Sequence, residues 1–147
     1  MKWILDTNVI SETIKRRPHD GVISWIEGCP ADEMTISIVT LAEIRDGISS
    51  APEPRRSQLM RWVQTDVEAQ FAQRVLPLKI EVITDWLRLS RKLAAERMIR
   101  RAADLLIAST ARVHRLTLVT RNIRHFANTG VVLYDPWSGK AHVMDAP

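Results

Sequence analysis

Short, unbroken runs of apolar residues alternate along this chain with longer segments in which apolar residues recur every three or four positions. Runs of the first kind favour buried strands, and segments of the second kind favour amphipathic helices. Strands that alternate with helices pair in the same direction, which predicts a parallel sheet with helices on both faces. We therefore expect an α/β three-layer sandwich of about five strands, at residues 2–5, 34–36, 75–78, 117–119 and 131–133.

The segments between these apolar runs have residue patterns that predict helices. Asp20 and Ser37 are the expected N-caps of two helices. Pro18 is expected to end the first helix of the chain, which begins near residue 7. The last expected strand is followed by Tyr134-Asp135-Pro136-Trp137, and a polar tail is expected after it. We expect one long helix from Pro52 onward and others at residues 7–17, 20–27, 38–49, 80–97 and 102–114.

Composition excludes several classes of protein. The 147 residues suffice for one core, so we expect a single domain over residues 1–147, and 46% hydrophobic residues are too many for a disordered chain. No apolar run approaches the ~20 residues that cross a bilayer, and Asp6 interrupts the apolar start before a signal-peptide core can form. The lone Cys29 excludes an internal disulfide, so we expect a reduced, cytoplasmic protein.

The chain is moderately basic, with 21 basic and 17 acidic residues and a net charge of +4. Arginine greatly outnumbers lysine, which suits bidentate contacts to phosphate. The charge is compatible with a nucleic-acid partner, although solvated helix faces would account for it equally well.

Polar residues follow two of the expected strands, in the segments 4–8 and 118–122. Ligands of parallel α/β folds bind beyond the carboxyl ends of strands, where the strand order reverses. The chain lacks both kinds of glycine-rich phosphate loop, G-x-G-x-x-G and G-x-x-x-x-G-K-[ST], which argues against dinucleotide and P-loop chemistry. The carboxylates and the amide at these strand ends favour a hard metal ion instead.

Two aspartates stand out as candidate ligands. Asp6 occupies a helix N-cap position, but Thr7 and Asn8 are expected to do the capping and to free Asp6 for another task. Asp104 lies at the head of an apolar helix stripe that includes Ile107, so its carboxylate is expected to point inward and to need a partner or a metal ion.

Other candidates are weaker. Glu43 lies off the apolar stripe of its helix, so periodicity predicts a solvated side chain there. The four histidines have no zinc-type spacing, and the G-x-S-x-G elbow of serine hydrolases is missing. The five tryptophans are expected to serve core and interface packing rather than base stacking.

Four segments in this order resemble a PIN domain, specifically the VapC-type toxin ribonucleases of toxin–antitoxin pairs. They are Ile4-Leu5-Asp6-Thr7-Asn8-Val9-Ile10-Ser11-Glu12, Leu41-Ala42-Glu43-Ile44, Ala103-Asp104-Leu105-Leu106-Ile107-Ala108 and Val119-Thr120-Arg121-Asn122. The closing segments Gly130-Val131-Val132-Leu133 and Pro136-Trp137 are also similar to that family. The resemblance covers essentially the whole chain and implies a PIN-like fold.

The resemblance implies a metal-dependent endoribonuclease in which Asp6, Glu43 and Asp104 hold Mg²⁺ or Mn²⁺. Thr120 and Asn122 match the polar pair beside the metal, which makes them candidate catalytic residues and Asn122 a further candidate ligand. The family commonly has another acidic residue at position 122 or three residues later, and this chain has Asn122 and His125 there. The lower negative charge and the imidazole favour Mn²⁺.

The resemblance also implies partners. The expected substrate is RNA, in particular tRNA or rRNA, and hydrolysis would use a water activated by metal. A small VapB-like antitoxin would neutralise the enzyme, and a homodimer is expected, with helix faces at Trp62 or Trp86 as candidate contacts. Arginines that flank the four segments are candidates for the RNA backbone: Arg97, Arg100, Arg101, Arg121 and Arg124.

Three alternatives stay open at this stage. A metal nuclease acting on DNA would show the same acidic residues, because recognition of the 2′-hydroxyl leaves no short motif. A binding module could keep the fold without catalysis, an idea motivated by Asn122 and His125. Phosphotransfer proteins match poorly, since their acidic pairs are missing near Asp6.

Overall fold

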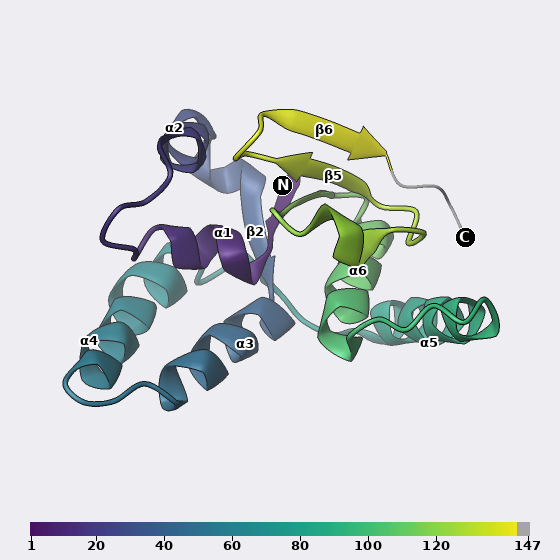
Figure 1. The fold of residues 1–147 in the computed structure, drawn as a ribbon, viewed down its shortest axis with the longest axis horizontal. Helices are drawn as coiled ribbons and strands as arrows, with labels where there is room; N and C mark the ends of the chain where they lie inside the picture. Colours follow the sequence, from purple (N-terminus) through teal and green to yellow (C-terminus); the bar gives the residue numbers. More distant parts are fainter. Residues whose placement is uncertain (144–147) are drawn as a thin grey trace.

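A computed structural model describes residues 1–143 as a central sheet with helices packed on both faces (Figure 1). The strands are β1 (Trp3–Leu5), β2 (Met34–Ser37), β3 (Val75–Leu76), β4 (Thr117–Val119), β5 (Val132–Asp135) and β6 (Lys140–Val143). The helices are α1 (Thr7–Glu12), α2 (Asp20–Gly28), α3 (Ile38–Ser49), α4 (Arg55–Trp62), α5 (Ile80–Ala95) and α6 (Ala102–His114). Shorter helical turns are η1 (Ala31–Glu33), the π-helical η2 (Val63–Glu68) and η3 (Ile123–Phe126).

The strand order is β3-β2-β1-β4-β5-β6, and the first five strands are parallel. The predicted fold class is therefore confirmed. From β1 the chain builds outward through β2 and β3, then returns to add β4 on the other side of β1. The order reverses between β1 and β4, so their carboxyl ends form the expected binding edge.

The sheet has six strands rather than the expected five. The sixth lies in the segment predicted as a polar tail, and it pairs antiparallel with β5. The turn that joins them is held by Asp135, whose carboxylate accepts hydrogen bonds from the Trp137 N–H and the Ser138 hydroxyl. Gly139 completes the turn at φ +69°, a conformation that glycine adopts without strain. Periodicity missed β6 because an exposed edge strand carries no buried stripe.

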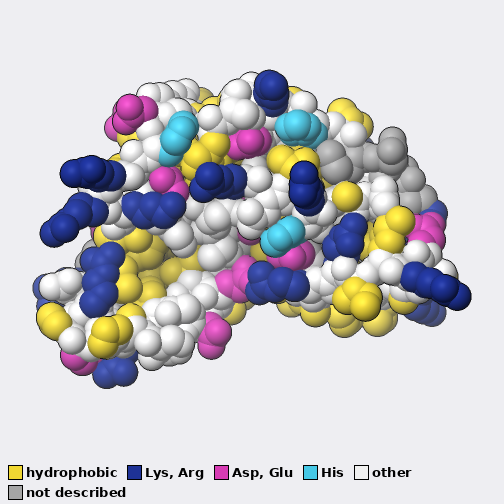
Figure 2. Space-filling view, viewed as in Figure 1, with side chains coloured by type: hydrophobic (Ala, Val, Ile, Leu, Met, Phe, Trp, Pro, Cys, Tyr) yellow, Lys and Arg dark blue, Asp and Glu magenta, His cyan; other side chains and the backbone are white. Residues whose placement is uncertain are grey.

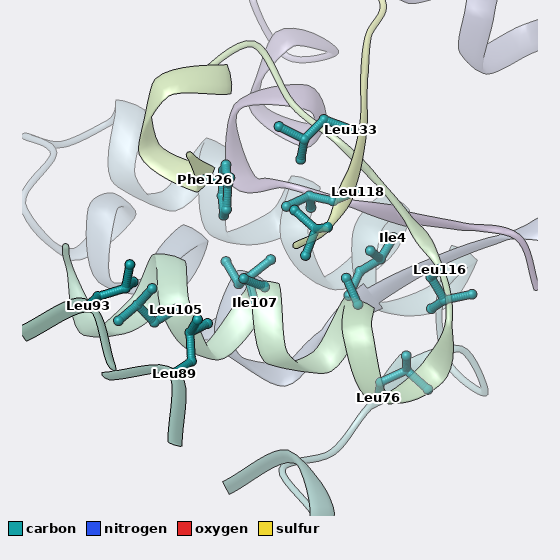
Figure 3. Packing of buried hydrophobic residues seen from close by; sticks show 13 residues of the cluster. Ile4, Leu76, Leu89, Leu93, Leu105, Ile107, Leu116, Leu118, Phe126 and Leu133 are labelled. Atoms are coloured by element: carbon teal, nitrogen blue, oxygen red, sulfur yellow. The ribbon is translucent and has the colours of Figure 1, made fainter. Parts of the chain in front are cut away.

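Two apolar clusters sit on opposite faces of the sheet, and alternate residues of β1 enter different ones. Ile4 joins the cluster under α5 and α6, with Leu118, Ile107 and Phe126 among its neighbours (Figure 3). Leu5 joins the cluster under α1 to α4. Alternation along a strand produces this division, and the strands read as continuous apolar runs because both faces are covered.

Several predicted boundaries were wrong, each for a local reason. The first helix ends at Glu12 rather than Arg17, and the α5 helix ends at Ala95, shortly before Arg97 adopts φ 57°. His19, not Asp20, caps α2. Three other boundaries also differ: β3 stops before Pro77, which has no N–H; β5 spans Val132–Asp135; and α4 begins at Arg55 and continues into η2.

The helix over residues 102–114 and the cap at Ser37 were predicted correctly: α6 spans Ala102–His114, and the Ser37 hydroxyl accepts from the Val39 N–H. Within residues 1–143 no helix is both long and apolar enough to cross a membrane.

Candidate functional site

Asp6 lies where β1 ends and α1 begins, with 5% of its surface exposed. It caps α1 itself, since its Oδ1 accepts the Thr7 N–H at 2.8 Å. The expectation that Thr7 and Asn8 would do the capping was therefore wrong. The other carboxylate oxygen accepts from Asn8 Nδ2 at 2.8 Å and from Thr120 Oγ1 at 2.7 Å. Asp6 thus has both a capping role and a fixed orientation at the binding edge.

Thr120 brings the second strand end to the same place. It follows β4, is fully buried, and donates its hydroxyl hydrogen across the edge to Asp6. Its hydroxyl oxygen also accepts from Asn8 Nδ2 at 3.1 Å and from the Asn122 N–H at 3.0 Å. Asn8 was not among the predicted site residues, although its position in the segment Asp6-Thr7-Asn8 could have identified it.

Glu43 on α3 also faces this edge. The Thr7 hydroxyl donates to its Oε2 at 2.6 Å, and Arg101 Nη2 donates to its Oε1 at 2.9 Å. Its side chain is 20% exposed, so the solvated side chain that periodicity predicts was wrong. The packing of α3 against α1 and α6 places Glu43 there, and the helical period of α3 alone contains no information about those neighbours.

Asp104 in the first turn of α6 is 6% exposed, which confirms the predicted inward orientation. Its carboxylate lies 3.8 Å from Arg101 Nη1 and 3.4 Å from His125 Nδ1. A buried carboxylate needs such partners because isolated burial of a charge is costly. Figure 2 shows acidic side chains gathered near the centre of one face, beside a cationic and a histidine side chain.

Burial and the repulsion of neighbouring acids raise the pKa values of Asp6 and Asp104. Burial raises the pKa of Asp6, and the nearby Asp104 and Glu43 raise it further, against the lowering effect of the Thr120 and Thr7 hydrogen bonds. Burial also raises the pKa of Asp104, with Glu43 adding to it and Arg101 and His125 opposing it. Asp6, Glu43 and Asp104 therefore form what we call the acidic centre, in which mutual repulsion disfavours the negative charges.

The donor set of this acidic centre suits a hard divalent cation, which binds carboxylate oxygens and relieves their repulsion. Within residues 1–143, however, no three acidic, histidine or cysteine side chains are already arranged to hold an ion. The Arg101 guanidinium lies between Glu43 and Asp104, where it supplies a positive charge to both carboxylates. The centre thus attracts a cation, and a metal ion there requires Arg101 to move aside.

Asn122 and His125, which stand where the resemblance implies a further acidic residue, differ in placement. His125 approaches Asp104, whereas Asn122 joins the network through its backbone N–H and has an exposed side chain. Of the two residues that replace the family's further acid, the structure brings His125 to the acidic centre.

The five arginines predicted to contact the RNA backbone lie in different parts of the structure. Arg101 contacts the acidic centre, and Arg121 lies against the Trp137 ring. Arg97 and Arg100 border a separate cavity near α5 and the start of α6. Arg124 is exposed in η3, one residue before His125. The structure therefore places Arg101 and Arg121 at or next to the edge where the acids converge, and Arg97 and Arg100 at a separate cavity.

A separate hollow opens between α1, α2 and the α4–η2 segment, with hydrophobic side chains visible in it in Figure 2. Its volume is about 420 Å³, and its lining is mainly apolar, with Ile10, Met34 and Phe71 among the residues. It contains none of the three acidic residues, so the chemistry belongs to the strand-end edge rather than to this hollow.

Comparisons with known proteins show which sequences and folds this chain is similar to. The family model of the PIN domain matches residues 3–132. VapC ribonuclease Y4jK of Sinorhizobium fredii is 31% identical over 135 residues, or 91% of this chain and 96% of that protein. The crystal structure of FitAcB from Neisseria gonorrhoeae has a TM-score of 0.85 at 29% identity, covering 92% of this chain and 98% of the other.

A further solved structure, VapBC-5 from Mycobacterium tuberculosis, is described as a member of the VapBC family of toxin-antitoxin systems. It shares 28% identity with a TM-score of 0.62, over 82% of this chain and 84% of its own.

Proposed function

The chain belongs to the PIN domain family, and from that premise we propose that it is a metal-dependent endoribonuclease toxin of the VapC type. The observation that carries the proposal is the acidic centre: Asp6, Glu43 and Asp104 come from three separate elements and meet at the strand-order reversal. The similarity to the ribonuclease Y4jK supports RNA as the substrate class, and we expect a tRNA or an rRNA.

Asp6, Glu43 and Asp104 would hold Mg²⁺ or Mn²⁺, with Asn122 as a candidate further ligand. The bound ion would act as a Lewis acid that makes hydroxide available near neutral pH and neutralises charge on the scissile phosphate. The chain's own contribution is orientation: Thr120 and Asn8 hold the Asp6 carboxylate. A fixed donor set costs little reorganisation when charge develops during hydrolysis.

Arg101 would change partners in the same process. It pairs with Glu43 and Asp104 here, while 66% of its side chain remains exposed, so it can leave without unfolding its surroundings. A guanidinium released beside the centre suits the planar, bidentate recognition of a substrate phosphate.

A small VapB-like antitoxin would restrain the enzyme. The similarity to a member of the VapBC toxin-antitoxin family supports such a partner. Arg101 illustrates the required chemistry, since a guanidinium can pair with the acidic centre in place of metal. An arginine from an antitoxin segment would act in the same way. We further propose that the enzyme works as a homodimer, which sedimentation of the purified protein would test.

Metal binding is the first test. We expect Mn²⁺ to bind in calorimetry to the wild-type protein and to Glu81→Gln, a matched loss of one exposed acid on α5. Asp104→Asn should lose that binding. No binding to the wild type would remove the basis for metal catalysis and favour a non-catalytic binding module.

Substrate class requires a second test, because a selective nuclease ignores most RNAs. We expect bacterial total RNA incubated with Mn²⁺ to show new ends at a few positions in tRNA or rRNA when the 5′ ends are mapped. The ends should be missing with Asp104→Asn. Cleavage of DNA but not RNA would assign the same acidic centre to a DNA nuclease.

A further inference from the structure

A second pocket lies at the opposite end of α1 from Asp6. Its volume is about 560 Å³, which is within the range of small-molecule sites. We call it the Trp137 pocket; its lining includes Glu12, Arg17, His19, Asp20, Arg121 and Trp137. It adjoins the acidic centre, because Arg121 directly follows Thr120 and its backbone N–H donates to Asn8 Oδ1 at 3.3 Å.

Flat side chains form its walls. The centroids of the His19 and Trp137 rings are 6.4 Å apart, and the Arg121 guanidinium carbon lies 5.6 Å from the Trp137 centroid. Trp137 is only partly buried. Trp3 and Trp25 are partly buried as well, but they pack edge to face against each other at 5.4 Å, whereas Trp137 lies beside His19 and Arg121. Aromatic rings beside arginine are the side chains on which unpaired RNA bases stack.

The walls of the Trp137 pocket are held in place by hydrogen bonds to Glu12 and by a close backbone approach at Gly21. Glu12 is 3% exposed and accepts from the His19 N–H at 2.9 Å and from Lys15 Nζ at 2.5 Å. Behind them, a Cβ at Gly21 would lie 2.9 Å from the Pro136 carbonyl oxygen. Glycine at this position lets the start of α2 approach the segment before Trp137 closely.

The charges of the Trp137 pocket suit a phosphate. Glu12 is already paired with Lys15. Among the other lining residues, the two positive charges of Arg17 and Arg121 outnumber the single negative charge of Asp20. The His19 ring accepts from the Gly21 N–H through Nδ1 at 3.2 Å. In a neutral ring this leaves the hydrogen on Nε2 as a donor. The pocket thus offers stacking surfaces, two guanidinium groups and a ring donor.

We propose that the Trp137 pocket binds one nucleotide of the RNA next to the cleaved bond. Its base stacks against Trp137 and His19, and its phosphate pairs with Arg17 and Arg121. The inference rests on the proposed function for the identity of the polymer. Glu12 is six residues from Asp6 on α1, a rise of about 9 Å, so the two sites lie close enough to hold neighbouring nucleotides of one strand.

Equilibrium binding tests this proposal without catalysis. The probe is a fluorescein-labelled single-stranded RNA decamer of random sequence, measured by anisotropy in EDTA at fixed ionic strength. Trp137→Leu should weaken binding about tenfold, because it keeps an apolar side chain but loses the stacking surface. Trp137→Phe should restore most of the affinity. Arg121→Ala, at an exposed position that does not depend on core packing, should weaken binding severalfold and flatten its salt dependence.

Matched controls separate this site from the acidic centre. Arg91→Ala removes one exposed arginine from α5 and should leave binding unchanged. Asp104→Asn should bind the probe at least as well as the wild type, because it removes negative charge near a polyanion.

The outcomes distinguish the two proposals. Equal binding by wild type, Trp137→Leu and Arg121→Ala overturns the nucleotide site, and RNA cleavage would still be judged by its own test. No binding of the probe by the wild type overturns the site as well. Loss of binding in both pocket variants supports the site even if Mn²⁺ fails to bind the acidic centre. Tighter binding of a fluorescein-labelled single-stranded DNA decamer, also of random sequence, overturns the assignment to RNA.

Discussion

Helix α1 has a buried carboxylate at each end, and the two behave oppositely. Asp6 precedes the first turn with 5% exposure, and Glu12 ends the last turn with 3% exposure. Burial raises the pKa of Asp6, with two neighbouring acids adding to the effect. Burial also pushes the pKa of Glu12 upward, but hydrogen bonds from Lys15 and the His19 backbone outweigh it, so that the pKa of Glu12 is lowered.

The difference lies in the partners rather than in the burial. Glu12 has a cation, Lys15, at 2.5 Å. Asp6 accepts hydrogen bonds only from neutral groups, and its charged neighbours named above are acids. At Glu12 the Lys15 cation balances the buried charge, whereas Asp6 lies among other acids and its charge calls for an outside cation. Charge balance therefore distinguishes the proposed catalytic end of α1 from its structural end.

The largest expected effect is at the acidic end. Asp6→Asn keeps a side-chain oxygen for the Thr7 N–H but removes charge that the metal needs, so RNA cleavage should fall by about two orders of magnitude or more. The substitution removes repulsion but also places an amide nitrogen opposite Asn8 Nδ2, so cleavage is compared after circular dichroism has shown that the variant is folded. Retained cleavage would show that Asp6 is a structural cap only.

The opposite pattern is expected at Glu12. Glu12→Ala removes the acceptor of the His19 N–H and the partner of Lys15, and should lower the free energy of unfolding by about 1 to 2 kcal/mol. Mn²⁺ affinity of the folded protein should stay unchanged, which calorimetry can check at a temperature well below unfolding. Glu81→Ala, at an exposed acid, serves as the control for stability. A selective loss of Mn²⁺ binding in Glu12→Ala would contradict the division between the two ends.

A smaller effect concerns the cation already present in the acidic centre. Arg101→Ala removes the guanidinium that competes with metal for Glu43 and Asp104. Since exposed ion pairs contribute at most about 1 kcal/mol, Mn²⁺ affinity should rise by up to about fivefold. Arg91→Ala makes the same change in net charge and should leave the affinity unaltered. Weaker Mn²⁺ binding in Arg101→Ala would show that Arg101 supports the site.

The smallest expected effect is on how stability depends on pH, which should have opposite directions at Asp6 and Glu12. Asp6 has a higher pKa folded than unfolded, so its contribution to stability is greatest below its unfolded pKa and is lost as pH rises through the folded value. Glu12 has a lower pKa folded, so its contribution is present above its unfolded pKa and is lost as pH falls through the folded value.

Denaturant unfolding of metal-free protein across the acidic range can measure both signs. The stability of Asp6→Asn relative to wild type should increase with pH, while the deficit of Glu12→Gln should shrink as pH falls. Parallel curves for the two variants would mean that the two carboxylates have similar environments after all.

Local patterns were informative wherever the physics is local. The helix over 102–114 and the inward Asp104 follow from the 3.6-residue period, and the Ser37 cap follows from its side-chain chemistry. The family resemblance selected Glu43, which periodicity placed in solvent. Neither route identified Asn8, whose bonds reach Thr120, 112 residues away.

By itself, the sequence determined the alternation of strands and helices, the three-layer class and the acids at strand and helix ends, because these depend on neighbours within a few residues. Only the tertiary structure decided which charges meet. It set Arg101 between two acids, His125 rather than the Asn122 side chain beside Asp104, and Trp137 across from His19. Such contacts join residues far apart in the chain, and their geometry depends on how the helices pack on the sheet.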